Sequence, residues 1–196
     1  MGSRSLDRAN SAADNIRKTV GTNARVTGLV NNDAINKSDI VVIAIPFSAL
    51  SETLKTLKPS FKEGQIVINL TVPLESSIGG SASRTIIPWD GSAGELSARL
   101  LPSNVKLVSA FNNVSAYQLN QLSQAVECDV LVCGDDEDTK RTVAELVKAI
   151  PGLRYIDAGR LENSRTIEQL TALLVNLNIR HKIKNAGLRI TGINGK

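Results

Sequence analysis

Residues 40 to 46 of the chain read Ile-Val-Val-Ile-Ala-Ile-Pro. An unbroken, mostly β-branched run of this length, ended by a proline, is typical of a strand with both faces buried. Strands of that kind belong to parallel sheets that helices cover on both sides. The run therefore predicts an α/β fold, and helices are expected before and after it.

On both sides of this run, segments with apolar residues at helical spacing alternate with short apolar runs that polar turns bound. Helices are predicted over residues 5–20, 48–57, 95–101, 117–125, 136–150 and 162–179. Strands are predicted over residues 24–29, 40–45, 65–70, 105–111, 129–133 and 153–156, with a long irregular connection over residues 72–94. The alternation predicts a doubly wound α/β sheet with parallel strands.

The composition is that of a globular protein. The chain has 196 residues, of which 42% are hydrophobic and 21% charged, with a net charge of +4. These values exclude a long disordered chain, and no apolar run approaches the roughly 20 residues of a membrane-spanning helix. Residues 2–11 are polar and the two cysteines, Cys128 and Cys133, give no disulfide framework. The sequence therefore predicts a cytoplasmic protein with neither a membrane nor a nucleic acid as partner.

The residues that follow the predicted strands are uncharged. In open α/β sheets, ligands bind outside the carboxyl ends of the strands. Residues 45–48, 69–73 and 111–116 follow three such ends, and they are small, apolar, or carry amides and hydroxyls. A hydrolase or lyase would normally place acids, bases or nucleophiles there. Hydride transfer between two bound carriers needs none, so we predict no catalytic side chain. The alternative interpretation is that these are ordinary loop residues.

The start of the chain gives a second indication. Gly2-Ser3-Arg4 precedes a predicted helix that carries Arg8 one turn later. In dinucleotide-binding folds, an arginine near the end of the second strand accepts a 2′-phosphate, whereas an acidic residue binds the free ribose hydroxyl. The tripeptide therefore favours NADP over NAD. The alternative interpretation is a solvated N-terminal tail.

The acidic run over residues 135–138 permits two interpretations. Carboxylates in such a cluster could hold a metal ion. The run also falls at the start of a predicted helix, where carboxylates cap free N–H groups. We predict no metal, and a cap formed by Asp135. His181, the only histidine, is expected at the surface.

Several motifs occur together along nearly the whole chain. They are Gly2-Ser3-Arg4, Thr27-Gly28, Asn32-Asp33-Ala34, Ile45-Pro46, Ser109-Ala110, Cys133-Gly134-Asp135-Asp136, Asp157-Ala158-Gly159 and Asn163-Ser164-Arg165. With these motifs the sequence resembles the NADP-dependent oxidoreductases of coenzyme F-420, archaeal and actinobacterial enzymes that pass a hydride between NADP and a deazaflavin. The resemblance implies a Rossmann-like sheet, small-molecule redox carriers as partners, and a cytoplasmic homodimer.

The resemblance also implies a role for each matching residue. Ser3, Arg4 and Arg8 would hold the 2′-phosphate of NADP. The other expected NADP contacts are Ile45 and Pro46 on the adenosine side, and Val72, Pro73 and Ala116 beside the nicotinamide. The expected deazaflavin contacts are Asn112, Asn113, Val114, Ala186 and Gly187. Residues 1–150 would form the NADP-binding domain, and residues 151–196 an extension with the deazaflavin side and the dimer contacts.

The chain departs from the family pattern in three ways, one of which is that Arg25 stands where relatives have a smaller residue and Ala186 where they have a leucine. Relatives begin with a strand, a Gly-rich turn, a helix and a second strand before the Gly-Ser-Arg, so roughly 30 residues of a βαβ opening are expected to be missing. Asn112 stands where relatives have a histidine, and Ser115 where they have a proline. These departures leave two alternatives open. One is a non-catalytic or weakly binding remnant, and the other is an NADPH-dependent reductase of another flavin, a metal chelate or an imine.

Overall fold

The computed structural model describes residues 1–193. Its elements, with short 3-10 helices labelled η, are β1 (Gly2–Ser3), α1 (Leu6–Val20), β2 (Leu29–Val30), α2 (Asn31–Asn36), β3 (Ile40–Ile43), α3 (Phe47–Leu57), η1 (Lys58–Ser60), β4 (Ile66–Asn69), η2 (Glu75–Ile78), α4 (Ala93–Leu100), β5 (Lys106–Ser109), α5 (Ala116–Leu119), β6 (Cys128–Gly134), α6 (Glu137–Lys148), β7 (Leu153–Asp157), η3 (Leu161–Asn163) and α7 (Ser164–His181). The predicted α/β class is confirmed.

The main sheet has five strands in the order β3-β4-β5-β6-β7, and β1 and β2 form a separate parallel pair. Every neighbouring pair of the main sheet is parallel except β5 and β6, which run antiparallel. A parallel partner for β5 would need a crossover helix long enough to return the chain along the sheet. The connection contains only the four-residue α5. The sheet is therefore mixed at this one pair.

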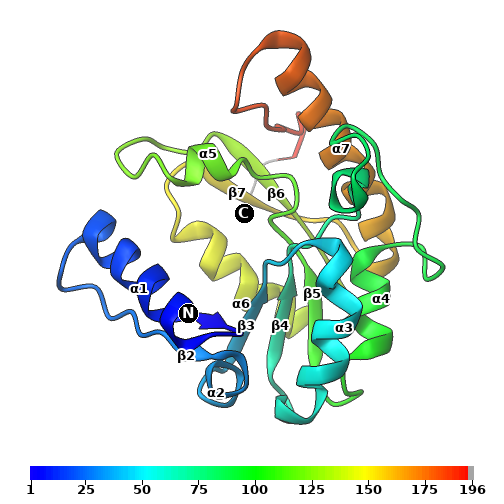
Figure 1. Ribbon diagram of the computed structural model, residues 1–196. Coiled ribbons are helices and arrows are strands. Elements are labelled where there is room, and N and C mark those ends of the chain that lie inside the picture. The colour runs from blue at the N-terminus through cyan, green and yellow to red at the C-terminus, as the bar shows by residue number, and fades with distance from the viewer. Residues whose placement is uncertain (194–196) are drawn as a thin grey trace.

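Helices cover both faces of the main sheet, as Figure 1 shows. On one face, Leu50 and Leu54 of α3 pack with Val67 of β4 and with α4. On the other face, α6 packs its valines against β5 and β6. Helix α7 contacts α4 and also packs against β6 through Ile167. Burial of these apolar faces is the main favourable term in such a fold.

The strand that the sequence run predicted is not buried on both faces, and it ends at Ile43 rather than Ile45. Val42 is 53% exposed, because α6 lies over β5, β6 and β7 and not over β3. In the described part of the chain, β3 is an edge strand that pairs with β4 alone. The strand buried throughout is β6, in which every residue is buried.

Two other predicted elements are much shorter than expected. The helix predicted over residues 117–125 reduces to α5, where the Asn120 side-chain amide donates to the carbonyl of Ala116 and competes with the helical ladder. The strand predicted over residues 24–29 reduces to β2. Before it, Gly28 lies so close to α1 that a Cβ there would be 2.5 Å from backbone atoms of Ala9 and Asn10.

The predicted cap of α6 falls one residue away from its real position. Asp136 is the cap, and its carboxylate accepts hydrogen bonds from the Thr139 backbone N–H at 2.8 Å and from the Thr139 hydroxyl at 2.6 Å. These bonds, with Lys106 nearby, lower the pKa of Asp136 to about 2. Asp135 instead pairs with Arg160.

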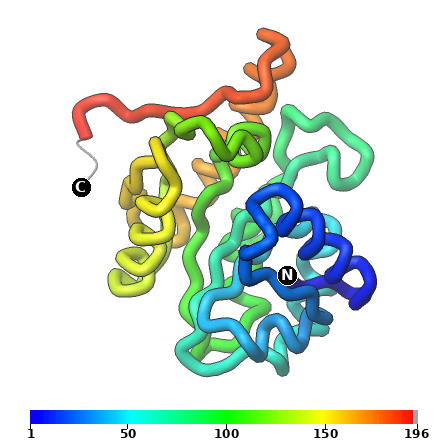
Figure 2. The backbone as a smooth tube through the Cα atoms, turned by 90° about the vertical axis from the view of Figure 1, so that its left-hand side faces the viewer, coloured from blue at the N-terminus to red at the C-terminus, as the bar shows by residue number. Residues whose placement is uncertain are grey.

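Residues 182–193, here called the C-terminal strap, run along one end of the molecule beside α5 (Figure 2). Their anchor is Asp129, a fully buried carboxylate of β6. It accepts hydrogen bonds from Arg154, from Arg189 and from the backbone N–H of Ile190. Burial raises the pKa of Asp129, but these donors together hold it below its ordinary value. No helix in residues 1–193 is long and apolar enough to cross a membrane.

Candidate functional site

Two neighbouring cavities lie between the β1–β2 pair and α3. The larger, about 420 Å³ and here called the apolar cavity, lies between Gly2 and the open edge of β3. The smaller, about 290 Å³ and here called the arginine cavity, is lined by Ser3, Arg4 and one face of α3. Asn31, Thr53 and Leu57 line both. The two cavities therefore adjoin, and their combined space is of the size that proteins use for small ligands.

The floor of this region is built by the first residues of the chain. Gly2 has no room for a side chain, since a Cβ there would lie 2.9 Å from the side-chain oxygen of Asn31. Gly2 thus lies close to Asn31, and the next two residues line the arginine cavity. Ser3 is half-buried there and Arg4 is exposed. Arg8 is exposed on α1 and is not part of the cavity lining.

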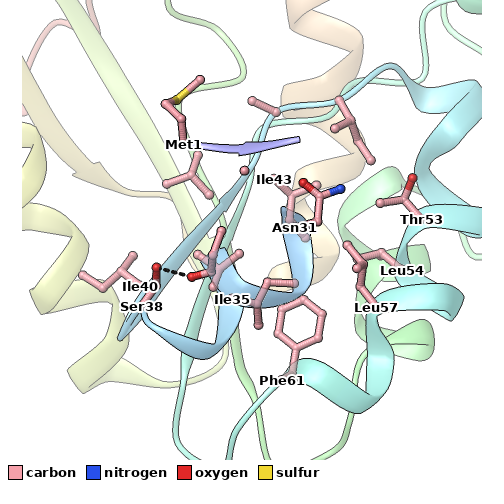
Figure 3. A pocket seen from close by; sticks show the side chains of 16 residues that line it. Met1, Asn31, Ile35, Ser38, Ile40, Ile43, Thr53, Leu54, Leu57 and Phe61 are labelled. Atoms are coloured by element: carbon pink, nitrogen blue, oxygen red, sulfur yellow. Dashed lines mark hydrogen bonds between the residues drawn. The ribbon is translucent and has the colours of Figure 1, made fainter. Parts of the chain in front are cut away.

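The opposite wall is a polar face of α3. Ala49, Glu52, Thr53 and Thr56 have helical spacing, and all four line the arginine cavity. The other face of α3 carries the buried Leu50 and Leu54. Figure 3 shows Thr53 on α3 beside the space into which Asn31 points from α2. The apolar period of α3 thus fixes which side chains reach the cavity.

At the carboxyl ends of β3, β4 and β5, neutral hydrogen bonds join three loops. The Thr71 hydroxyl donates to the carbonyl of Ile45 at 3.1 Å. The Thr71 carbonyl accepts from the side-chain amides of Asn69 and Asn112. The Ser109 hydroxyl donates to the side-chain oxygen of Asn112. These contacts connect predicted site loops that lie far apart in the sequence, and they do so without charged groups.

Asn112 and Asn113 are buried, and their side-chain amides bind within the protein. The Asn113 amide donates to the carbonyl of Asp129 at 2.6 Å. The carbonyl of Asn112 accepts from Thr171 of α7. The preceding Phe111 has a φ of 62°, an uncommon value for a residue with a side chain. These two asparagines shape the turn, and their predicted contact with a deazaflavin stays a prediction.

The remaining predicted contacts lie around the same loops. Ile45 lines the apolar cavity, whereas Pro46 is exposed at the start of α3. After β4, Val72 is half-buried and Pro73 is buried. After β5, Val114 is half-buried and Ala116 is exposed. On the C-terminal strap, the Ala186 N–H donates to Asn178, and Gly187 packs against Cys128.

The comparisons with known proteins agree with one another. Residues 1–73 match the family model described as NADP oxidoreductase coenzyme F420-dependent. The F420-dependent NADP reductase of Methanothermobacter thermautotrophicus is 42% identical over 98% of this chain and 84% of its own length. The chain belongs to the F420-dependent NADP reductase family. The member of this family from Methanocaldococcus jannaschii is also 42% identical, over 98% of this chain and 87% of its own length.

A solved structure supports the fold of this family member. The structure of a putative F420-dependent NADP reductase from Arthrobacter sp. FB24 has a TM-score of 0.76 and 23% identity. It covers 97% of this chain and 86% of that chain. At this level of identity the match supports the Rossmann-like α/β fold alone.

Sequence reasoning missed one group beside the strand ends. Glu168 of α7 is 2% exposed, and its carboxylate accepts hydrogen bonds from the backbone N–H groups of Ala93 at 2.8 Å and Gly94 at 3.0 Å. Burial outweighs these bonds and raises the pKa of Glu168 to about 7. Nearby, the hydroxyls of Ser92 and Ser164 share a hydrogen bond at 2.8 Å. The signal in the sequence was a glutamate on the apolar stripe of a helix.

Proposed function

We propose that the chain is an oxidoreductase that transfers a hydride between NADP(H) and the deazaflavin coenzyme F-420. The observation that carries the proposal is the 42% identity with F420-dependent NADP reductases over 98% of the chain. The structure supports it through a cavity that contains Ser3 and Arg4 beside a set of uncharged strand ends. The two carriers supply the redox chemistry, a hydride passing between nicotinamide C4 and deazaflavin C5.

The residues of the chain fit the phosphate-bearing half of NADP. Arg4 offers a guanidinium fork and Ser3 a hydroxyl in one cavity, and both groups can donate hydrogen bonds to a 2′-phosphate. The hydrogen bonds around Thr71 and Asn112 join the strand ends through neutral groups. We assign binding, orientation and exclusion of water to these residues.

The test is the oxidation of NADPH by coenzyme F-420, followed at the deazaflavin absorbance band. The Methanothermobacter relative serves as the positive control. We expect turnover with NADPH and much slower turnover with NADH. Absence of both turnover and NADP binding would reject the proposal. Parallel assays with other flavins, metal chelates and imines decide whether the acceptor is the deazaflavin.

A second candidate is a non-catalytic or weakly binding form of the family. It is favoured by the lack of a G-x-G-x-x-G sequence in the 196 residues. That sequence normally brings the pyrophosphate to a helix N-terminus. Calorimetry with NADP decides this question, since micromolar binding together with turnover would eliminate the candidate.

We also propose that the protein is a cytoplasmic homodimer. Three exposed apolar side chains on α7 and the start of the strap support the dimer: Leu173, Ile179 and Ile183. The division into residues 1–150 for NADP and 151–196 for the deazaflavin and the dimer contacts stays a prediction, and its last three residues lie outside the described part of the chain. Fractionation of cells and sedimentation of the purified chain test the compartment and the dimer.

A further inference from the structure

Asp129 of β6 connects two segments that lie far apart along the chain. Its carboxylate accepts hydrogen bonds from the C-terminal strap, from the guanidinium of Arg189 at 3.0 Å and from the backbone N–H of Ile190 at 2.7 Å. Its backbone carbonyl accepts a hydrogen bond from the side-chain amide of Asn113 at 2.6 Å. One buried residue therefore holds the strap through its side chain and the turn after β5 through its main chain.

The carboxylate of Asp129 also has a partner inside the sheet. Arg154 of β7 donates to both carboxylate oxygens, each at 2.7 Å. A fully buried carboxylate needs such donors because it has lost its hydration, and a bidentate arginine is the strongest single partner for it. The further donors, Arg189 and Ile190, both belong to the strap. This second set of bonds therefore fixes the strap against β6.

The strap and the turn also contact each other and a common neighbour. The Ser115 hydroxyl donates to the carbonyl of Lys184 at 2.7 Å. Gly187 packs so close to Cys128 that a Cβ there would lie 3.3 Å from the cysteine sulfur, and the side-chain amide of Asn113 lies 3.5 Å from the same sulfur. The two segments therefore meet at the start of β6, where Asp129 holds both.

The expected deazaflavin contacts are divided between these two segments. Asn112, Asn113 and Val114 lie in the turn, whereas Ala186 and Gly187 lie on the strap. A planar carrier that needs both groups binds only when both segments are in place. Its apparent affinity therefore falls with the fraction of molecules in which the strap is docked.

We propose that Asp129 is a positioning residue that docks the C-terminal strap against the turn at residues 111–116 and so assembles the deazaflavin side of the site. This inference rests on the proposed function, because the deazaflavin contacts of both segments are themselves proposed. Asp129 acts through Asn113 and the strap, and it takes no part in hydride transfer.

Amide hydrogen exchange of the full chain, followed by NMR, tests the docking without a ligand. Two protected amides report on the segments without contacting Asp129: the Ala186 N–H donates to Asn178, and the Val114 N–H donates to the carbonyl of Phe111. Asp129→Asn keeps the size of the side chain and removes its charge. We expect both amides to exchange roughly tenfold faster or more, the factor of one lost charge-assisted hydrogen bond.

A milder variant, Arg189→Met, removes one bond of the strap and leaves the salt bridge of Arg154 with Asp129 in place. It is expected to accelerate exchange at the same two amides, and Arg189→Lys to restore most of the protection. The matched control is Arg141→Met, which removes the same charge from an exposed ion pair on α6. This control is expected to leave both exchange rates unchanged.

Calorimetry with coenzyme F-420 and with NADP gives a readout that a purely structural role would not separate. In Asp129→Asn and Arg189→Met, we expect coenzyme F-420 to bind about fivefold more weakly or worse, and the dissociation constant of NADP to change less than about twofold. Faster exchange at Ala186 alone, or unchanged binding of coenzyme F-420 in both variants, would overturn the inference while leaving the proposed function in place. Failure of the unchanged chain to bind coenzyme F-420 would overturn the proposed function as well.

Discussion

Among single residues, the two arginines of the predicted phosphate site have different positions. Arg4 lines the arginine cavity, whereas Arg8 is exposed on α1 outside the lining. We therefore predict that Arg4→Ala weakens binding of adenosine 2′,5′-bisphosphate roughly 10- to 100-fold, the effect of losing a charge-assisted hydrogen bond. Arg8→Ala, which removes the same charge, is predicted to change the dissociation constant less than about threefold. Calorimetric titration of both variants measures the difference, and equal losses would place the phosphate elsewhere.

Glu168 gives a residue-scale prediction about pH. Its pKa is about 7 in the folded protein and near 4.5 when the chain is unfolded. The folded state therefore binds the proton of Glu168 more tightly, so the contribution of this group to stability is fully present below pH 4.5 and is lost as the pH rises to about 7. The loss is on the order of 3 kcal/mol, because one pKa unit corresponds to about 1.4 kcal/mol. Urea unfolding at a series of pH values measures this slope.

The variant Glu168→Gln cannot ionise, so it is predicted to remove that part of the pH slope between pH 4.5 and 7. Glu95, which raises the pKa of Glu168 further, pairs with Arg165. Glu162→Gln serves as the control, because Glu162 is exposed nearby and its loss leaves the buried carboxylate in place. A slope that persists unchanged in Glu168→Gln would show that another group causes it.

At the residue scale, the sequence predicted where charge is absent better than where each side chain points. The uncharged character of residues 69–73 and 111–116 is visible in the sequence itself. The burial of Asn112 and Asn113 could not be seen in the sequence, because it depends on Thr171 and Asp129, which are far away along the chain.

At the scale of the elements, the start of α6 depends on one aspartate. Asp136 accepts from the N–H and hydroxyl of Thr139, whereas Asp135 pairs with the exposed Arg160. Asp136→Ala is predicted to lower the Tm clearly, because a capping carboxylate is lost, and Asp135→Ala to leave it nearly unchanged. The depressed pKa of Asp136, about 2, means that the benefit is present above its unfolded pKa and is lost as the pH falls toward 2. A larger effect from Asp135→Ala would contradict this assignment.

Elements with a clear apolar pattern were predictable. The α3 and α7 helices and β4, β6 and β7 lie close to their predicted positions, because their apolar spacing matches the faces that they bury. The predicted helix over residues 117–125 failed, since side-chain hydrogen bonds at Asn120 and the short connection decide its length. The exposure of β3 could not be predicted, because a run of β-branched residues does not say which helix lies above it.

For the whole molecule, exposed apolar side chains on α7 predict self-association. Leu173 is 54% exposed and Ile179 is 63% exposed, on a helix whose other side is buried in the core. We predict that the chain sediments at twice its 21.0 kDa mass and that Leu173→Lys shifts it toward the monomer. Leu146→Lys is the control, since Leu146 is also partly exposed but lies on α6. Sedimentation of the unchanged chain as a monomer would contradict the dimer.

The central claim is direct hydride transfer between two carriers held at uncharged strand ends, and an isotope experiment tests it. The chain is incubated in ordinary water with coenzyme F-420 and NADPH that carries deuterium in both positions at nicotinamide C4. Mass spectrometry of the reduced deazaflavin then locates the label. The account predicts one deuterium at C5 of the deazaflavin. Reduced deazaflavin without deuterium at C5, its new hydrogen having come from water, would contradict the account.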